Sequence, residues 1–206
     1  MSTRVRRANK ATSSQLSSVL PKVFDLKGSR CTTQVSTSSE LLDVDRQSVW
    51  ELLEQNMRHM YVGSSMGWDP PSKKEELFHR NSRFILLRRS QVQDDADVCG
   101  EPSIVAYSMF RFEMENDERV LYCYELQVVQ DVRRGGIGKT LVQCLCNIAR
   151  EWDMQKVMLT VFKENQMALL FYKAMGFIAD SDSNLDHEDD VDYWIMSKDT
   201  GVTCDA

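Results

Sequence analysis

The 206-residue sequence lacks the features that mark several classes of protein. It has no apolar run near the roughly 20 residues that cross a bilayer, so we expect no membrane span. No apolar segment of a secretory signal follows the first residues. The six cysteines form no C-x-x-C pair and the three histidines are far apart, which argues against a metal site and favours reduced thiols. This length favours one domain over two.

A surplus of positive charge is missing as well, because the formal net charge is −6. That balance argues against general nucleic-acid binding and is compatible with a basic partner. Two segments depart from it: a basic start (Arg4, Arg6, Arg7, Lys10) and a late acidic run (Asp180, Asp182, Asp186, Glu188, Asp189, Asp190, Asp192). We interpret both as solvated segments. For the basic start, nuclear localisation and contact with nucleic acid or a ribosome are the functional alternatives.

Hydrophobic patterning predicts three parts: a flexible basic and Ser/Thr-rich arm (residues 1–30), one domain (31–200) and a short tail (201–206). The domain should begin with a helix from Asp43 or Asp45 and a second helix after Asp69 and Pro70. Strands are expected at 83–89, 103–112 and 119–129, with 113–118 as the loop of an antiparallel hairpin. A helix to about Trp152, a buried parallel strand (157–162), a helix that Asn165 caps, and a last strand pair at Phe177 and 193–197 should follow.

The most informative stretch is a β-rich run, 122–129, that leads into a basic, glycine-rich turn, 131–139. This turn opens directly into a helical pattern, so several backbone N–H groups converge at a positive helix N-terminus. Glycine lets the backbone approach a bound phosphate at positions where a Cβ would be in the way. The pattern therefore predicts a site that binds a pyrophosphate without a metal.

Two motifs resemble those of the GCN5-related N-acetyltransferases, the GNAT family. Arg133-x-x-Gly136-x-Gly138 matches the family's [QR]-x-x-G-x-[GA] signature for the pyrophosphate of acetyl-CoA, and residues 171–177, FYKAMGF, resemble its later F-Y-x-x-x-G-F element. The resemblance implies an α/β fold with a mixed central sheet that splays open and is flanked by helices. It also implies acetyl-CoA as co-substrate and no metal.

Longer blocks resemble the NatD-type N-alpha-acetyltransferases, which acetylate the Ser-Gly-Arg-Gly termini of histones H4 and H2-A. The blocks are 56–61, 110–112, 120–125 and 156–163 with Asn165, and the resemblance covers about residues 40–197. It implies histone tails as partners, a nuclear and cytoplasmic location and a monomer. Two alternatives stay open: a GNAT enzyme that acts on lysine side chains or small amines, and an inactive module that binds CoA or docks on histones.

The resemblance also assigns a co-substrate site. The strand that ends at Val129 and the strand 157–162 should splay apart. Leu126, Gln127 and Val128 would then offer backbone groups to the pantetheine arm and the thioester carbonyl, and one N–H is a candidate oxyanion donor. Asn165 would bind near the CoA arm, and the pyrophosphate would be bound by the turn residues Arg133, Arg134, Gly135, Gly136, Ile137, Gly138 and Lys139.

Glu125 is the first candidate for a general base in a direct attack of the amine on the thioester. An α-amine has an ordinary pKa of about 7.7–8.0, so a weak or water-mediated base is enough. Tyr61 and Tyr124 are placed at the peptide entrance, and Tyr172 is at the position credited with protonating the departing thiolate. The alternatives are a structural carboxylate for Glu125 and packing roles for the tyrosines.

Specificity for a third-position arginine should come from Glu113 and Glu115 in the hairpin loop, which flank Met114. Trp68 and Tyr193 are expected to wall the peptide channel. The chain departs from its relatives at two places: Met66 replaces a tryptophan, and Glu113 replaces an aspartate. Both changes bear on the strictness of histone selectivity and leave acetyl transfer itself intact.

Overall fold

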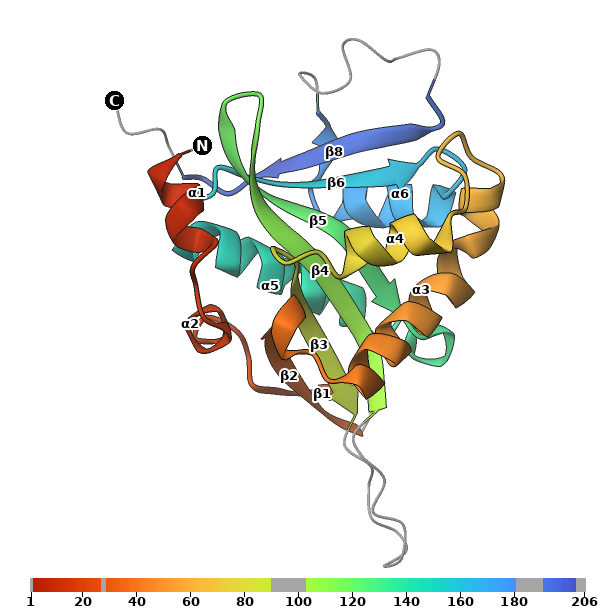
Figure 1. Cartoon of the computed structure of the whole chain (residues 1–206), viewed down its shortest axis with the longest axis horizontal. Helices are drawn as coiled ribbons and strands as arrows, with labels where there is room; N and C mark the ends of the chain where they lie inside the picture. Colours follow the sequence, from red (N-terminus) through yellow and green to blue (C-terminus); the bar gives the residue numbers. More distant parts are fainter. Residues whose placement is uncertain (1, 27–28, 90–102, 181–190, 203–206) are drawn as a thin grey trace, which may run out of the picture.

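The computed structural model describes residues 2–26, 29–89, 103–180 and 191–202. These residues form one open sheet of eight strands in the order β1-β2-β3-β4-β5-β6-β8-β7 (Figure 1). All neighbouring pairs are antiparallel except β5 and β6. The strands are β1 (Val23–Leu26), β2 (Ser29–Thr37), β3 (Arg83–Arg89), β4 (Ser103–Glu115), β5 (Glu118–Val128), β6 (Lys156–Phe162), β7 (Ile178–Ala179) and β8 (Tyr193–Asp199).

Helices cover both faces of this sheet (Figure 1). One face packs under α3 (Asp43–Val62) and α4 (Pro70–Leu77), in a cluster that includes Leu53, Leu77 and Tyr107. The other face carries the larger cluster, into which α5 (Ile137–Glu151) and α6 (Gln166–Ala174) pack. The layered α/β fold with a mixed sheet that the resemblance implied is confirmed.

Local chemistry explains where several elements begin and end. The Asp69 side chain accepts a hydrogen bond from the Ser72 N–H, and prolines occupy the first turn of α4. Asn165 caps α6 through the Ala168 N–H at 3.1 Å. Gly176 follows α6 with a φ of +85°, a conformation that favours glycine. These predicted caps are confirmed.

The segment expected to be a flexible arm is folded where the structure describes it. Residues 3–8 form α1 (Thr3–Ala8), residues 13–17 form α2 (Ser13–Ser17), and β1 and β2 extend the sheet from its β3 edge. Val5, Ala8 and Leu16 are fully buried in the cluster on the α5 face. The expectation was wrong for this segment because these three buried side chains, carried by two helices of only six and five residues, fix it to the sheet.

The hairpin loop is also shorter than predicted. β4 runs to Glu115 and β5 begins at Glu118, so the connection is the two-residue turn Asn116-Asp117. Both turn residues have positive φ values, +45° and +63°, as a tight turn between twisted antiparallel strands requires. Glu113, Met114 and Glu115 therefore lie on a strand and not in a loop.

Some sequence features remain outside the described residues. Most of the acidic run lies between 180 and 191, and the turn signal at 100–102 and the last four residues are likewise not described. Within the described ranges, every helix is too short or too polar to span a lipid bilayer.

Candidate active site

The two central parallel strands separate in the middle of the sheet. β5 and β6 pair only from Val120↔Lys156 to Cys123↔Leu159, although β5 continues to Val128 and β6 to Phe162. The predicted splay is therefore confirmed. Beyond the last pair, the edges of both strands face an opening rather than each other, which leaves backbone polar groups available to a ligand.

The free backbone groups can be assigned from the alternation of an antiparallel ladder. Val129 N–H bonds to Val105 on β4, so Gln127 also points its backbone groups toward β4, while those of Leu126 and Val128 point into the splay. The Val128 carbonyl already accepts hydrogen bonds from Asn56 Nδ2 at 3.2 Å and from Arg133 Nε at 3.1 Å. Leu126 and the Val128 N–H thus remain for a ligand. Gln127 contributes its side chain instead of the backbone groups expected from the sequence.

A β-bulge at Tyr124 arranges the side chains of β5. Met109 is opposite Glu125 and Phe110 is opposite Cys123, so Tyr124 is the extra residue on β5. Tyr124 and Glu125 consequently both reach the side of the sheet that carries α4, where Tyr124 meets Arg111 and Glu125 meets Lys73.

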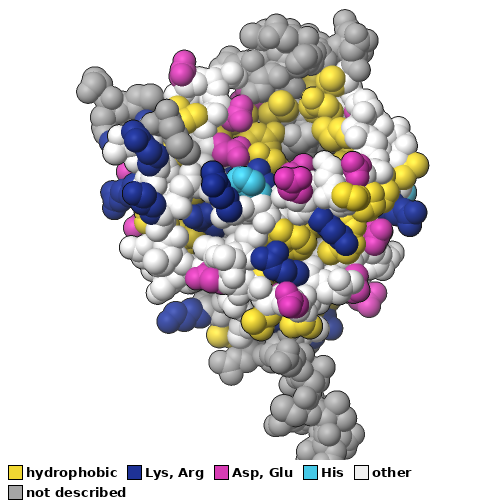
Figure 2. Space-filling view, in the orientation of Figure 1, with side chains coloured by type: hydrophobic (Ala, Val, Ile, Leu, Met, Phe, Trp, Pro, Cys, Tyr) yellow, Lys and Arg dark blue, Asp and Glu magenta, His cyan; other side chains and the backbone are white. Residues whose placement is uncertain are grey.

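The pocket on this side of the splay is acidic, and we call it the acidic pocket. Its charged lining residues are Lys73, Glu76, Glu115 and Glu125, three carboxylates against one ammonium. Aromatic side chains of Tyr61, Tyr122, Tyr124 and Phe162 form much of the remaining wall. In Figure 2, apolar side chains lie in the upper part of the molecule with acidic side chains next to them. Such a pocket suits a cationic group with a short apolar neighbour.

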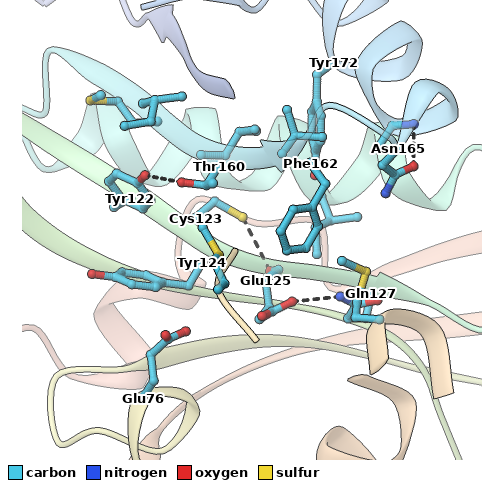
Figure 3. A pocket seen from close by; sticks show the side chains of 18 of the residues that line it. Glu76, Tyr122, Cys123, Tyr124, Glu125, Gln127, Thr160, Phe162, Asn165 and Tyr172 are labelled. Atoms are coloured by element: carbon cyan, nitrogen blue, oxygen red, sulfur yellow. Dashed lines mark hydrogen bonds between the residues drawn. The ribbon is translucent and has the colours of Figure 1, made fainter. Parts of the chain in front are cut away.

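Glu125 is 4% exposed and has a partner at each oxygen. Gln127 Nε2 donates a hydrogen bond to Oε2 at 2.8 Å, and Lys73 Nζ is 2.9 Å from Oε1, off the direction of a regular hydrogen bond. Figure 3 shows Glu125 and Gln127 side by side on β5, with the Phe162 ring between them and Tyr172. The carboxylate is thus held in one orientation at the base of the acidic pocket.

Lys73 is a site residue that the sequence analysis missed. It reaches Glu125 from α4, lies 2.6 Å from Glu76 Oε1, and places its ammonium 4.8 Å from the centre of the Tyr61 ring. Burial alone would lower the pKa of Lys73, but the negative charge of Glu125 and the neighbouring Tyr61 and Glu76 raise it well above its ordinary value. One feature of the sequence could have indicated that Lys73 faces inward: it lies one helical turn before the buried Leu77 and so shares its face of α4.

Aromatic residues around Tyr61 form one wall of the acidic pocket. Its ring lies 5.7 Å from Trp68 and 5.1 Å from Phe162, and Trp68 stacks on Trp50 at 5.6 Å. Burial, and after it the negative charge of Glu125, raise the pKa of Tyr61. The hydroxyl therefore keeps its proton. Tyr61 lines the pocket as expected, whereas Trp68 supports it from behind and Met66 takes the lining position.

Tyr124 and Glu113 form a second contact beside the pocket. The Tyr124 hydroxyl donates to the Glu113 carboxylate at 3.0 and 3.1 Å, and Arg111 lies over the Tyr124 ring at 4.4 Å. Burial raises the pKa of both Glu113 and Glu115. Of the predicted arginine readers, Glu115 lines the acidic pocket and Glu113 does not. Met114 packs toward the core, and Tyr193, opposite Phe162 on β8, is not among the lining residues either.

The second pocket lies at the glycine turn and is basic, so we call it the basic pocket. Arg133, Arg134 and Lys139 line it, without a carboxylate among its described lining residues. Gly136, with a φ of +89°, is the residue before α5, so the N–H groups of the first turn are open to an anion. Gly138 leaves little spare room, because a Cβ there would lie 3.1 Å from the Phe171 ring. Gly135 does not line the pocket, and Ile137 does.

The two pockets share lining residues at the splay: Met57, Leu126, Gln127, Asn165, Ala168 and Tyr172. A ligand with an anionic end in the basic pocket can therefore place its other end against the acidic pocket. Tyr172 is 9% exposed, and its burial raises the pKa of its hydroxyl well above the ordinary value. No group of three or more potential metal ligands occurs among the described residues.

The profile of the Acetyltransferase (GNAT) family matches residues 47–177, which include every lining residue of the two pockets except Ile195. The chain belongs to the GNAT acetyltransferase family. Its fold resembles an acetyltransferase of this family from Staphylococcus aureus Mu50, with a TM-score of 0.59, 15% identity, and coverage of 82% of this chain and 99% of that one. Acetyl-CoA is the family's co-substrate, and the basic pocket with its open helix N-terminus fits the pyrophosphate of CoA.

Two further solved structures share this fold. Arabidopsis thaliana NAA60 in complex with a bisubstrate analogue has a TM-score of 0.57 and 12% identity, with 84% of this chain and 100% of that chain covered. The Escherichia coli ribosomal-protein-S18-alanine N-acetyltransferase has a TM-score of 0.55 and 14% identity, with 85% and 97% covered. At these identities the likeness concerns the fold alone.

Proposed function

We propose that this GNAT acetyltransferase transfers acetyl from acetyl-CoA to the N-terminal amine of proteins, with the tails of histones H4 and H2-A as substrates. The observation that carries the proposal is the meeting of a basic and an acidic pocket at shared residues in the splay. The basic pocket suits the phosphates of CoA. The acidic pocket suits a cationic acceptor such as a protonated amine.

The charges decide which group can take the proton of that amine. Lys73 remains protonated, because its pKa lies far above neutrality, and therefore cannot act as a base. Glu125 lies beside it, on the strand whose backbone edge faces the splay. An α-amine is already partly neutral at physiological pH, so Glu125 can accept its proton directly or through a water molecule.

The remaining groups orient the reactants and stabilise developing charge. Attack of the neutral nitrogen on the thioester carbonyl forms the C–N bond, and breakage of the C–S bond releases CoA as a thiolate. The free N–H of Leu126 or Val128 can donate to the carbonyl oxygen during this attack. The Tyr172 hydroxyl, whose pKa is well above that of a thiol, stabilises the thiolate as a hydrogen-bond donor without surrendering its proton.

Selectivity for a Ser-Gly-Arg-Gly terminus rests on the acidic pocket and its aromatic wall. Glu115 lines the pocket and can accept the third-position guanidinium in a charge-assisted pair. Glu113 instead fixes the Tyr124 hydroxyl and, through it, the shape of the entrance. The resemblance to NatD-type enzymes supports this substrate class, as does the ribosomal-protein-S18-alanine N-acetyltransferase among the solved structures of the same fold. Histone substrates would place the enzyme in the nucleus and cytoplasm.

The proposal is tested with a Ser-Gly-Arg-Gly-Lys peptide whose N-terminus is either free or already acetylated. Acetyl transfer only to the free peptide is the expected result. Transfer to the blocked peptide would instead identify a lysine acetyltransferase, and no transfer to either would favour another amine acceptor or an inactive CoA-binding module. A third peptide, with alanine in place of arginine, should show a lower kcat/KM; an unchanged value would exclude arginine recognition.

A further inference from the structure

A chain of hydrogen bonds connects the basic pocket to Glu125. Arg133 donates from Nη2 to Asn56 Oδ1 at 2.7 Å, and Asn56 Nδ2 donates to Gln127 Oε1 at 3.0 Å. Gln127 Nε2 then donates to Glu125 Oε2 at 2.8 Å. The chain crosses from the glycine turn to α3 and on to β5, and it joins the group beside the phosphate site to the group proposed as the base.

The direction of this chain is fixed at its start. A guanidinium only donates, so the Asn56 atom that faces Arg133 must be the carbonyl oxygen. The Val128 carbonyl, which only accepts, faces the Asn56 amide nitrogen at 3.2 Å and requires the same orientation from a second side. Asn56 therefore donates from its amide nitrogen to the side-chain oxygen of Gln127. The amide nitrogen of Gln127 can then donate to Glu125.

We propose that Asn56 and Gln127 are positioning residues that use the cation of Arg133 to hold a hydrogen-bond donor against Glu125. The inference rests on the proposed role of Glu125 as the base. Without a fixed orientation, the Gln127 amide could turn its oxygen toward the carboxylate, and two acceptors would then face each other. Lys73 holds the other oxygen of Glu125, so the chain completes the orientation of the carboxylate.

Two substitutions at Asn56 separate this role from simple structural support. Asn56→Asp keeps a partner for Arg133 but removes the donor, so Gln127 turns its nitrogen to the new carboxylate and its oxygen to Glu125. Asn56→Leu removes every hydrogen bond of the side chain, yet leaves Gln127 free to donate to Glu125. We expect kcat at saturating acetyl-CoA to fall about tenfold for Asn56→Asp and only about threefold for Asn56→Leu. A purely structural residue would give the opposite order, because the leucine variant loses more contacts.

The effect of the Asn56 substitutions on kcat must also depend on Gln127. When Gln127 is also replaced by methionine, the kcat values of the two Asn56 variants should differ by less than about twofold, because the amide that connects Asn56 to Glu125 is absent. A difference that persists there would show a direct effect of the added charge and would overturn the proposal. Gln55→Glu is the matched control, since it adds the same charge at the exposed neighbouring residue of α3, and it should leave kcat unchanged.

A measurement without turnover separates failure of this inference from failure of the proposed function. The NMR signals of the Gln127 side-chain amide can be assigned because they are lost in Gln127→Met. They should shift when Glu125→Gln is introduced into the wild-type protein, and shift far less when it is introduced into the Asn56→Asp protein. If the signals shift equally in both proteins, the chain of hydrogen bonds has no fixed direction and the inference fails. If they behave as expected while Glu125→Gln leaves kcat unchanged, the base assignment fails, and with it the positioning role.

Discussion

Replacing Lys73 with methionine removes the ammonium that faces Glu125 and keeps most of the side chain's length. The two charged atoms are 2.9 Å apart, and the side chains are only 11% and 4% exposed. At an effective dielectric constant of about 20, two unit charges at this distance attract by about 6 kcal/mol. Without Lys73, the buried Glu125 carboxylate would have neither a positive partner nor water to stabilise its charge. We therefore expect Lys73→Met to lower the free energy of unfolding by about 3–5 kcal/mol.

The assay is equilibrium unfolding in urea of four proteins: the wild type, Lys73→Met, Glu125→Gln and the double variant. The double variant leaves no unpaired buried charge at this position, because Glu76, the other carboxylate beside Lys73, is 38% exposed; it should therefore be more stable than Lys73→Met alone. The coupling between the two substitutions should reach at least about 2 kcal/mol. Lys74→Met is the matched control: the neighbouring lysine is exposed and lies over the Trp50 ring, and its loss should cost about 1 kcal/mol or less.

Two results would refute this reasoning. A loss below about 1 kcal/mol for Lys73→Met would mean that the pair behaves like a solvated surface ion pair. Additive effects of the two substitutions would mean that Lys73 and Glu125 do not interact in solution. Either result would remove the electrostatic basis for a fixed carboxylate at the splay.

Three further predictions follow from particular contacts. Gly138→Ala should raise the KM for acetyl-CoA about three- to tenfold and leave kcat largely intact in steady-state kinetics, because the new methyl displaces the Phe171 ring of the basic pocket. Leu16→Ala should lower the free energy of unfolding by about 2–5 kcal/mol in urea, whereas Val44→Ala, on an exposed side chain, should change it little; equal small effects would mean that α2 is not docked. Because burial raises the pKa of Glu115, its charge is present above that pKa and lost as the pH falls through it. The ratio of kcat/KM for arginine and alanine peptides should therefore fall as the pH is lowered through the raised pKa of Glu115, and a constant ratio would exclude a titrating carboxylate as the reader.

The sequence predicted those parts of the fold that local chemistry determines. Asp69 before two prolines, Asn165 before α6 and Gly176 after it each satisfy helix-end groups, so these boundaries could be predicted from neighbouring residues. The glycine turn likewise has a local explanation, because a positive φ at Gly136 and an open helix N-terminus follow from the residues themselves.

Other parts depend on partners far away in the chain. Val5 and Ala8 are one helical turn apart and Leu16 lies on a separate short helix, so the apolar pattern is too short to predict either helix, and packing against the sheet stabilises α1 and α2. The bulge at Tyr124 follows from pairing with β4, and no single strand predicts it. The contact between Lys73 and Glu125 joins residues 52 positions apart in the sequence, so the residues of α4 alone indicate only a short, polar helix.

The central claim is that the basic and acidic pockets hold both substrates at once and meet at the splay. It is tested most directly with a bisubstrate compound in which the sulfur of CoA is joined through an acetyl linker to the N-terminal nitrogen of Ser-Gly-Arg-Gly. Inhibition should be competitive against acetyl-CoA and also against the acceptor peptide. Competition with acetyl-CoA alone, at the affinity of CoA itself, would contradict the claim, because the acidic pocket would then not hold the acceptor.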